Sequence, residues 1–221
     1  MSDRQLTDLR ARLGGRGKRE LIEGMIVRSP HPAATGRLIT ALEVYPLATL
    51  MLAHDYPTKI WILDRGEKVS SAGILTQRIL HRRWHSAGIG VDDCEGLTDV
   101  APGYVAVVTS WRSLLVMRHE FAHAVTTFFS APFRQQLRQL YDEARLRGQF
   151  TEPLAGESIG EYVACGLSYH FFPDLRTELM AVDPALYRLI DRFIAQAEDL
   201  SMRLTAEEAQ PAAGVEERTG V

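Results

Sequence analysis

Residues His119, Glu120 and His123 form the pattern H-E-x-x-H within a long apolar segment. In an α-helix, residues four positions apart lie on the same face, so both imidazoles can reach one metal ion. Glu120 lies about 100° further round the helix axis, close enough to hold a water molecule beside that metal. We therefore predict that His119 and His123 are zinc ligands and that Glu120 is a general base.

A third protein ligand is needed, because catalytic zinc sites usually combine three protein ligands with one water. The metzincin pattern would require glycine and histidine at positions where this chain has Thr126 and Phe129, so that class is excluded. A carboxylate from a later helix is the other common solution. The predicted helix at 157–172 offers Glu157 and Glu161, four residues apart and expected on one face. Either is a candidate ligand, and the other would orient a ligating histidine.

Two segments, HEFAHAV and PLAGESIGEYVACGLSYHF, resemble the active-site segments of gluzincins of the lethal-factor-like group, which includes bacterial Pro-Pro endopeptidases. The shared features are the H-E-F-G/A-H helix, a helical hairpin and a later helix that begins Glu-aromatic-x-Ala. In that family the glutamate before the aromatic residue is the third zinc ligand. The resemblance covers about residues 104–200, and it implies that Glu161, which precedes Tyr162, is this ligand.

The chain departs from the family's pattern at two positions. The family often has an acid four residues after the ligand, where this chain has Cys165, for which we expect a packing role. It also often has a tyrosine seven residues before the ligand, which stabilises the tetrahedral intermediate, and here that position is Leu154. Another tyrosine would have to replace it, since one oxyanion donor typically contributes 10²- to 10³-fold in rate. We take Tyr169 as the candidate, with Tyr104 and Tyr162 as alternatives.

The composition fits a single globular domain with flanking segments. The chain has 221 residues, a formal net charge of -3, 46% hydrophobic residues and 24% charged residues. We expect no nucleic-acid partner, although the basic residues before Glu20 and the stretch His81–His85 keep nucleic-acid binding as an alternative hypothesis. No apolar segment suits a membrane span or a Sec signal peptide, so we expect no membrane partner. The predicted location is the cytoplasm, or outside the cell by a route without a Sec signal.

The predicted fold is α+β and zincin-like, with a small N-terminal sheet followed by a mostly helical C-terminal half. We divide the chain into a basic, partly flexible leader (1–25), a zincin-like domain (26–205) and a disordered tail (206–221). Hydrophobic periodicity and turn residues predict strands at 59–64 and 104–109, a loop at 87–102, a helical segment at 38–54 that Pro46 interrupts, and helices at 114–130, 132–148, 157–172 and 184–204.

The strand at 104–109 directly precedes the motif helix, so we expect it to form the wall of a cleft and to align an extended substrate. Together these features predict a zinc-dependent metallopeptidase that hydrolyses peptide bonds of a peptide or protein substrate. A zinc-activated water would be the nucleophile, and Glu120 the base. The alternative is a zinc-binding, catalytically impaired zincin that acts as a binding or regulatory module, as Leu154 suggests. The sequence predicts no oligomeric state.

Overall fold

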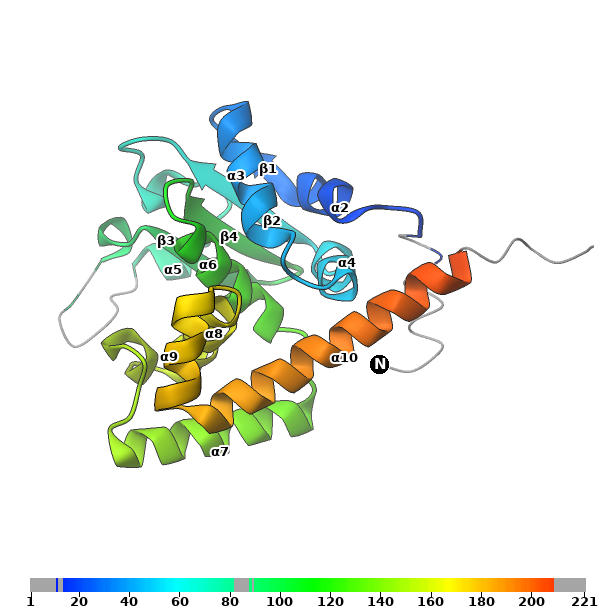
Figure 1. Cartoon of the computed structure of the whole chain (residues 1–221). Helices are drawn as coiled ribbons and strands as arrows, with labels where there is room; N and C mark the ends of the chain where they lie inside the picture. The colour runs from blue at the N-terminus through cyan, green and yellow to red at the C-terminus, as the bar shows by residue number, and fades with distance from the viewer. Residues whose placement is uncertain (1–10, 12–13, 82–87, 89, 209–221) are drawn as a thin grey trace, which may run out of the picture.

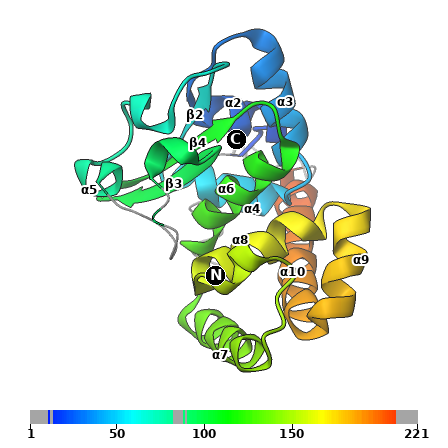
Figure 2. The same cartoon turned by 90° about the vertical axis from the view of Figure 1, so that its left-hand side faces the viewer.

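The computed structural model describes residues 11, 14–81, 88 and 90–208. The sheet and the helices α2–α4 form one part of the molecule, the helices α7 and α9 lie in the other, and the long helix α10 runs from these two helices to α4 (Figure 1). Helices α6 (Leu114–Thr126) and α8 (Ile159–His170) pack against each other between these parts, as the rotated view also shows (Figure 2). The α+β class, with a sheet in the N-terminal half and a helical C-terminal half, is confirmed.

The sheet has four strands in the order β1-β2-β4-β3. Strand β2 runs parallel to both β1 and β4, whereas β3 and β4 are antiparallel. A tight turn joins β3 to β4, and Gly103 supplies its positive φ of 84°. The predicted strands at 59–64 and 104–109 are confirmed. The four strands are β1 (Ile26–Arg28), β2 (Thr58–Leu63), β3 (Gly96–Ala101) and β4 (Tyr104–Ser110).

The prediction of a loop at 87–102 is wrong for residues 91–93, which form the short 3-10 helix η2 (Val91–Asp93), and for residues 96–101, which form strand β3. Strand β3 contains glycine and aspartate, which have low β-propensity, so its sequence gives a weak local signal. It is stabilised by pairing along its whole length with β4. Its buried Asp99 accepts hydrogen bonds from the backbone N–H and the hydroxyl of Thr76, at 2.9 and 2.7 Å.

Strand β4 lies inside the sheet, between β2 and β3, and its central residues are buried. The expectation that the strand at 104–109 aligns an extended substrate is therefore wrong, because it has no free edge for a peptide. Both of the strand's hydrogen-bonding edges are already used, and the outer edge nearest to α6 belongs to β3.

The predicted helices are present, and several of their bounds differ from the prediction. The helical segment at 38–54 is split as expected, and Pro46 is the N-cap of its second part. Helix α8 begins at Ile159, two residues later than predicted, and Pro173 begins an additional helix, α9. The helices and turns are α2 (Lys18–Met25), α3 (Pro32–Leu42), α4 (Leu47–Asp55), η1 (Val69–Ser71), α5 (Gln77–Leu80), α6, α7 (Ala131–Arg147), η3 (Pro153–Gly156), α8, α9 (Pro173–Val182) and α10 (Pro184–Glu208).

The folded body includes part of the segment assigned to the leader, because Leu21, Ile22 and Met25 of α2 are buried in the main core. Helix α10 likewise continues to Glu208, into the segment assigned to the tail. Residues 1–10, 12 and 13 of the leader, the tail from 209 onward and residues 82–85 of the basic stretch lie outside the described residues. Within the described ranges, no helix has the length and apolar character needed to cross a membrane.

Arg118 fixes the position of α6 from inside the protein. Its Nε donates to the carbonyl of Ala41 at 2.9 Å, near the end of α3, and its Nη1 donates to the carbonyl of Phe171 at 3.1 Å, after the end of α8. The guanidinium also lies 4.2 Å from the ring centre of Phe172. One buried side chain thus ties the motif helix to two others through carbonyls at their C-terminal ends, where a positive charge is favoured.

Asp183 fixes the first turn of α8 in a similar way. As the residue before α10, it accepts a hydrogen bond from the backbone N–H of Leu186 at 2.9 Å through Oδ1, as an N-cap residue does. Its Oδ2 accepts a hydrogen bond from the hydroxyl of Tyr162. Both side chains are buried, and Tyr162 follows Glu161 directly.

We expect Asp183→Ala to lower the free energy of unfolding by about 2–4 kcal/mol, because it removes an N-cap and leaves the buried hydroxyl of Tyr162 without its acceptor. Asp183→Asn should cost less, since asparagine can cap the helix and accept the same bond. Urea unfolding of the full chain measures both. The exposed Asp174 in the first turn of α9 is the control, and Asp174→Ala should change stability by less than about 1 kcal/mol. Equal losses at positions 183 and 174 would contradict this assignment.

Candidate metal centre

Helix α6 carries its two motif histidines on the side that faces α8. Ser113 caps the helix by accepting the backbone N–H of Val116 at 3.2 Å. The residues Met117, Phe121, Ala124 and Val125 are buried in the core. This apolar surface fixes the rotation of the helix about its axis, so that His119 and His123 border a cavity.

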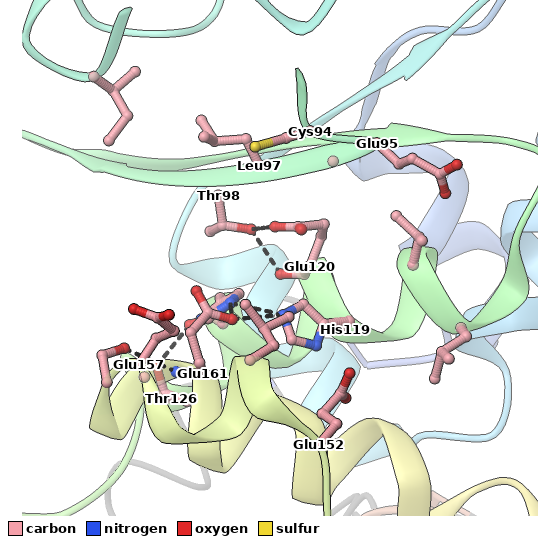
Figure 3. A pocket seen from close by; sticks show the side chains of 18 of the residues that line it. Cys94, Glu95, Leu97, Thr98, His119, Glu120, Thr126, Glu152, Glu157 and Glu161 are labelled. Carbon is pink, nitrogen blue, oxygen red and sulfur yellow. Dashed lines mark hydrogen bonds and ion pairs between the residues drawn. The ribbon is translucent and has the colours of Figure 1, made fainter. Parts of the chain in front are cut away.

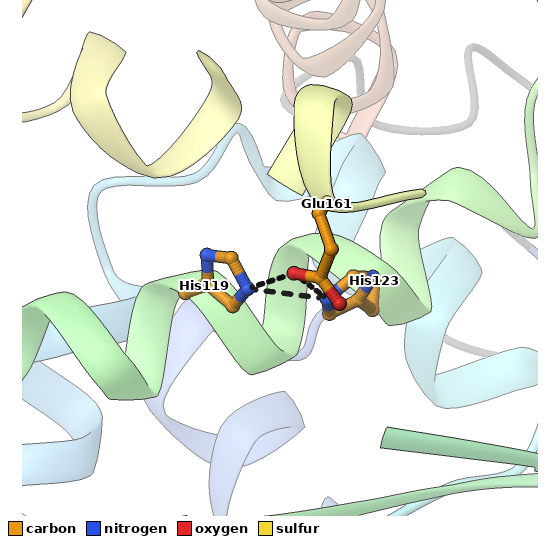
Figure 4. Close-up of side chains that lie close together, drawn as sticks. All are labelled: His119, His123 and Glu161. Carbon is orange, nitrogen blue, oxygen red and sulfur yellow. Dashed lines mark hydrogen bonds and ion pairs between the residues drawn. The ribbon is translucent and has the colours of Figure 1, made fainter. Parts of the chain in front are cut away.

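Helix α8 presents Glu161 from its first turn. Ser158 is the N-cap and accepts the backbone N–H of Glu161 at 3.2 Å. In a capping box, the side chain of a glutamate at this position would accept a hydrogen bond from the backbone N–H of the N-cap residue. Here the carboxylate of Glu161 instead faces the two imidazoles of α6 (Figure 4).

The three side chains bring their ligand atoms together. Nε2 of His119 lies 2.9 Å from Oε2 of Glu161 and 3.2 Å from Nε2 of His123, and the remaining pair is 3.3 Å apart. Two ligands on a tetrahedral zinc ion, each about 2.0–2.1 Å from the metal, are separated by roughly 3.3 Å. The triangle therefore has the size of one face of a zinc tetrahedron. Two imidazoles and one carboxylate are also a donor set that zinc accepts.

The carboxylate of Glu161 stays ionised in this position. Burial raises its pKa, but hydrogen bonds from His119 and His123 and their charges outweigh burial and hold the pKa well below its usual range. The site therefore offers a negative charge next to two nitrogen ligands.

Glu120 lies beside this triangle under strand β3, with 8% of its surface exposed (Figure 3). The hydroxyl of Thr98 lies 2.9 Å from its Oε2 and 2.8 Å from its backbone oxygen. Burial raises the pKa of Glu120 to about 7, although His119 and the bond from Thr98 act in the opposite direction. A Cβ atom at Gly96 would lie 2.6 Å from Cγ of Glu120, so the side chain of Glu120 fills the space that glycine leaves.

A cavity of about 660 Å³ connects these groups. Its walls come from strand β3, from helix α6 and from the segment that runs from Glu152 into α8 (Figure 3). The cavity is large enough for several residues of an extended peptide, and it exposes both the candidate ligands and Glu120.

The other candidate ligand, Glu157, lies elsewhere in the wall of the cavity. It follows the 3-10 helix η3 and precedes the N-cap Ser158, so it is not part of α8. The expectation that Glu157 and Glu161 share one helical face is therefore wrong. In the sequence, Ser158 and Glu161 are three residues apart, which is a usual signature of a helix start and indicates that α8 begins after Ser158. The geometry of the triangle favours Glu161 as the third ligand.

The three tyrosines considered for an oxyanion role have different surroundings. Tyr104 donates its hydroxyl to the carbonyl of Ile74 at 2.9 Å, and Tyr162 donates to Asp183. Tyr169 borders the cavity and donates to Oε1 of Glu152 at 2.9 Å. A catalytic role for Tyr169 stays a prediction.

The sequence did not indicate Gly96, Thr98 or Glu152 as part of the site. Gly96 and Thr98 belong to the strand that was expected to be a loop, and Glu152 precedes η3. Their positions depend on contacts between distant segments, for which no local pattern exists.

The chain thus has a zincin-like α+β fold, and it brings together two histidines and one glutamate that could hold a metal ion. The fold is similar to the solved structure of a Pro-Pro endopeptidase (PPEP-2) from Paenibacillus alvei, with a TM-score of 0.58 and 16% sequence identity. The similarity covers 78% of this chain and 99% of that one. No protein-family model matches the chain, nor does any curated protein.

We expect the purified protein to bind zinc at about one ion per chain, and Glu161→Ala to abolish this binding, since three protein ligands are the usual minimum for a catalytic zinc site. His119→Ala and His123→Ala should have the same effect. Elemental analysis after dialysis measures the metal content. Glu157→Ala is the matched control, because Glu157 borders the same cavity outside the triangle. Zinc lost from the Glu157 variant and kept by the Glu161 variant would reverse the assignment.

Proposed function

We propose that this protein is a zinc-dependent metallopeptidase of the gluzincin type that hydrolyses peptide bonds. The observation that carries the proposal is the arrangement of His119, His123 and Glu161 as one face of a tetrahedron, with the carboxylate of Glu120 opening on the same cavity. The fold shared with a Pro-Pro endopeptidase supports it. The substrate class is a peptide or a protein.

His119, His123 and Glu161 would hold the zinc ion. Zinc, when bound, supplies a Lewis acid that lowers the pKa of a water molecule and polarises the carbonyl of the substrate. In our proposal, Glu120 accepts a proton from the attacking water and later gives it to the leaving amine. Thr98 and the space at Gly96 keep the carboxylate in one orientation for both transfers.

We further propose that an extended substrate pairs with the outer edge of β3. In the described part of the chain this edge pairs with no other strand, and Gly96, Leu97, Thr98 and Val100 all border the cavity. Main-chain hydrogen bonds along a strand edge fix the register of a peptide without depending on its side chains. The strand that supports Glu120 would thus also place the scissile bond.

The alternative is a zinc-binding zincin that no longer cleaves and acts as a binding or regulatory module. It is favoured by Leu154, which borders the cavity with an apolar side chain where the related family often has a tyrosine. The hydroxyl of Tyr169 is also already engaged by Glu152. Cleavage assays decide between the two functions.

Glu120→Gln tests the proposed mechanism, because glutamine has almost the same shape and still accepts a bond from Thr98, but takes up no proton. We expect the rate of cleavage of a peptide library, measured by mass spectrometry, to fall by about 10²- to 10⁴-fold. Zinc content and the midpoint of thermal unfolding should stay unchanged. Glu157→Gln serves as the control in the same cavity wall. An active Glu120 variant would refute the mechanism, and a zinc-loaded wild type that cuts no peptide would establish the alternative.

Tyr169→Phe tests the proposed oxyanion donor. If the hydroxyl of Tyr169 turns from Glu152 to the substrate oxygen during the reaction, its removal should lower kcat about 10²- to 10³-fold with little change in KM. Tyr104→Phe is the control, because that hydroxyl is bonded to a carbonyl of residue 74. Equal kcat values for the Tyr169 variant and the wild type would exclude Tyr169 from this role.

A further inference from the structure

The walls of the cavity differ in charge from the chain as a whole. Among the described residues, six acidic side chains border the cavity and no lysine or arginine does. The whole chain is nearly balanced, with 25 lysines and arginines and 28 aspartates and glutamates. The two histidines in the cavity wall are the candidate zinc ligands, and a histidine that holds a metal is neutral. The cavity therefore has a local excess of negative charge.

Zinc, when bound, would compensate only part of this charge. Its two positive charges would match those of Glu161, its ligand, and of Glu120 beside the triangle. Four of the six acids would remain, and Asp93, Glu95 and Glu152 are among them. None of these three forms an ion pair with a lysine or an arginine in the part of the chain that the structure describes.

The hydrogen bonds of these carboxylates come from neutral donors. Asp93 accepts the backbone N–H of Gly90 at 2.8 Å, and Glu152 accepts the hydroxyl of Tyr169 at 2.9 Å. Glu95 is exposed, and within the described ranges its carboxylate accepts no hydrogen bond. A neutral donor orients a carboxylate and leaves its charge in place. These groups therefore present negative charge to any molecule that enters the cavity.

Two of the carboxylates lie in opposite walls. Glu95 directly precedes β3 and Glu152 directly precedes η3, and Figure 3 shows them on either side of His119. Charges of one sign in a cleft with apolar walls reinforce one another's field. This field also acts on the half-buried thiol of Cys94 in the same cavity. Burial and the negative charges nearby, that of Glu120 first among them, raise the pKa of Cys94 to about 11.

A second observation, independent of the net charge, indicates that a ligand enters this cavity. The side chain of Glu120 is 8% exposed and borders the cavity. Thr98 bonds its Oε2, whereas its Oε1 has no hydrogen-bond partner among the described residues. Polar atoms of buried side chains usually have a partner, so this oxygen is available to a group that comes from outside the chain.

We propose that the substrate is a basic peptide segment, in which lysine or arginine side chains near the scissile bond pair with Glu95 and Glu152. The main-chain bonds proposed for the edge of β3 fix the register of a peptide, but they do not select its sequence. The two carboxylates supply this selection, because they attract cationic side chains and repel acidic ones. The inference rests on the proposed function, since it names the substrate of that site.

The test measures binding, so that it does not depend on turnover. Zinc-loaded Glu120→Gln is titrated into labelled peptide pools whose central residues are random and whose flanking residues are lysine, glutamine or glutamate. We expect the lysine pool to bind about 10-fold more tightly than the glutamine pool, and the glutamate pool to bind most weakly. Fluorescence anisotropy measures the three affinities. The preference for lysine should decrease as salt rises from about 50 to about 500 mM.

Further substitutions in the same protein assign the preference to residues. Glu95→Gln and Glu152→Gln should each lower the ratio of lysine to glutamine affinity about 3- to 10-fold, and the double variant should bind both pools alike. Glu152→Gln keeps an acceptor for Tyr169 and removes only the charge. Asp174→Asn is the control, because Asp174 is an exposed acid that does not border the cavity. The zinc content of every variant is measured alongside.

The outcomes separate this inference from the proposed function. Equal affinities for the three pools would overturn the inference and leave the metallopeptidase proposal intact. A lysine preference that survives both substitutions would overturn the roles of Glu95 and Glu152. Zinc lost from these variants, with the peptide preference unchanged, would assign the two acids to the metal and also overturn the inference. If the wild type cuts no pool but Glu120→Gln prefers lysine, the proposed catalysis fails and the preference for a basic ligand holds.

Discussion

The packing of α6 against α8 is the constraint on which the rest of the structure depends. Two imidazoles from one helix and a carboxylate from the other meet within 3.3 Å, in an otherwise apolar interface. A different distance or rotation of the two helices would separate these atoms. The remaining elements fix this crossing. If the crossing changed, the buried carboxylate would lose its two imidazole partners, and an unmatched buried charge is costly.

Buried polar groups at the ends of helices provide much of this fixation. Arg118 joins α6 to the C-terminal ends of α3 and α8. Asp183 joins the start of α10 to the first turn of α8, next to Glu161. The hydroxyl of Tyr45 donates to the backbone carbonyl of Arg118 at 3.0 Å. Directional contacts of this kind specify an orientation, whereas apolar packing alone would tolerate sliding of the helices.

The sequence predicted the parts of this site that depend on local patterns. The motif helix, the second helix with Glu161 and the split at Pro46 follow from helical periodicity and capping residues. Strand β3 was missed because its Gly-Leu-Thr-Asp pattern becomes a strand only through pairing with β4. Glu157 was placed in a helix because periodicity could not show that Ser158 is the N-cap. Glu152 reaches the site through its contacts with α8, and no local sequence pattern indicates such a contact.

The glycine at position 96 has a consequence for how such a protein can change during evolution. While Glu120 occupies the space beside it, a larger residue at 96 would displace the carboxylate, so selection for the carboxylate's position also acts on the glycine. A chain in which Glu120 no longer occupied this space could accept larger side chains there. In related chains, a residue larger than glycine at this position would then indicate that the glutamate beneath it no longer keeps its present position.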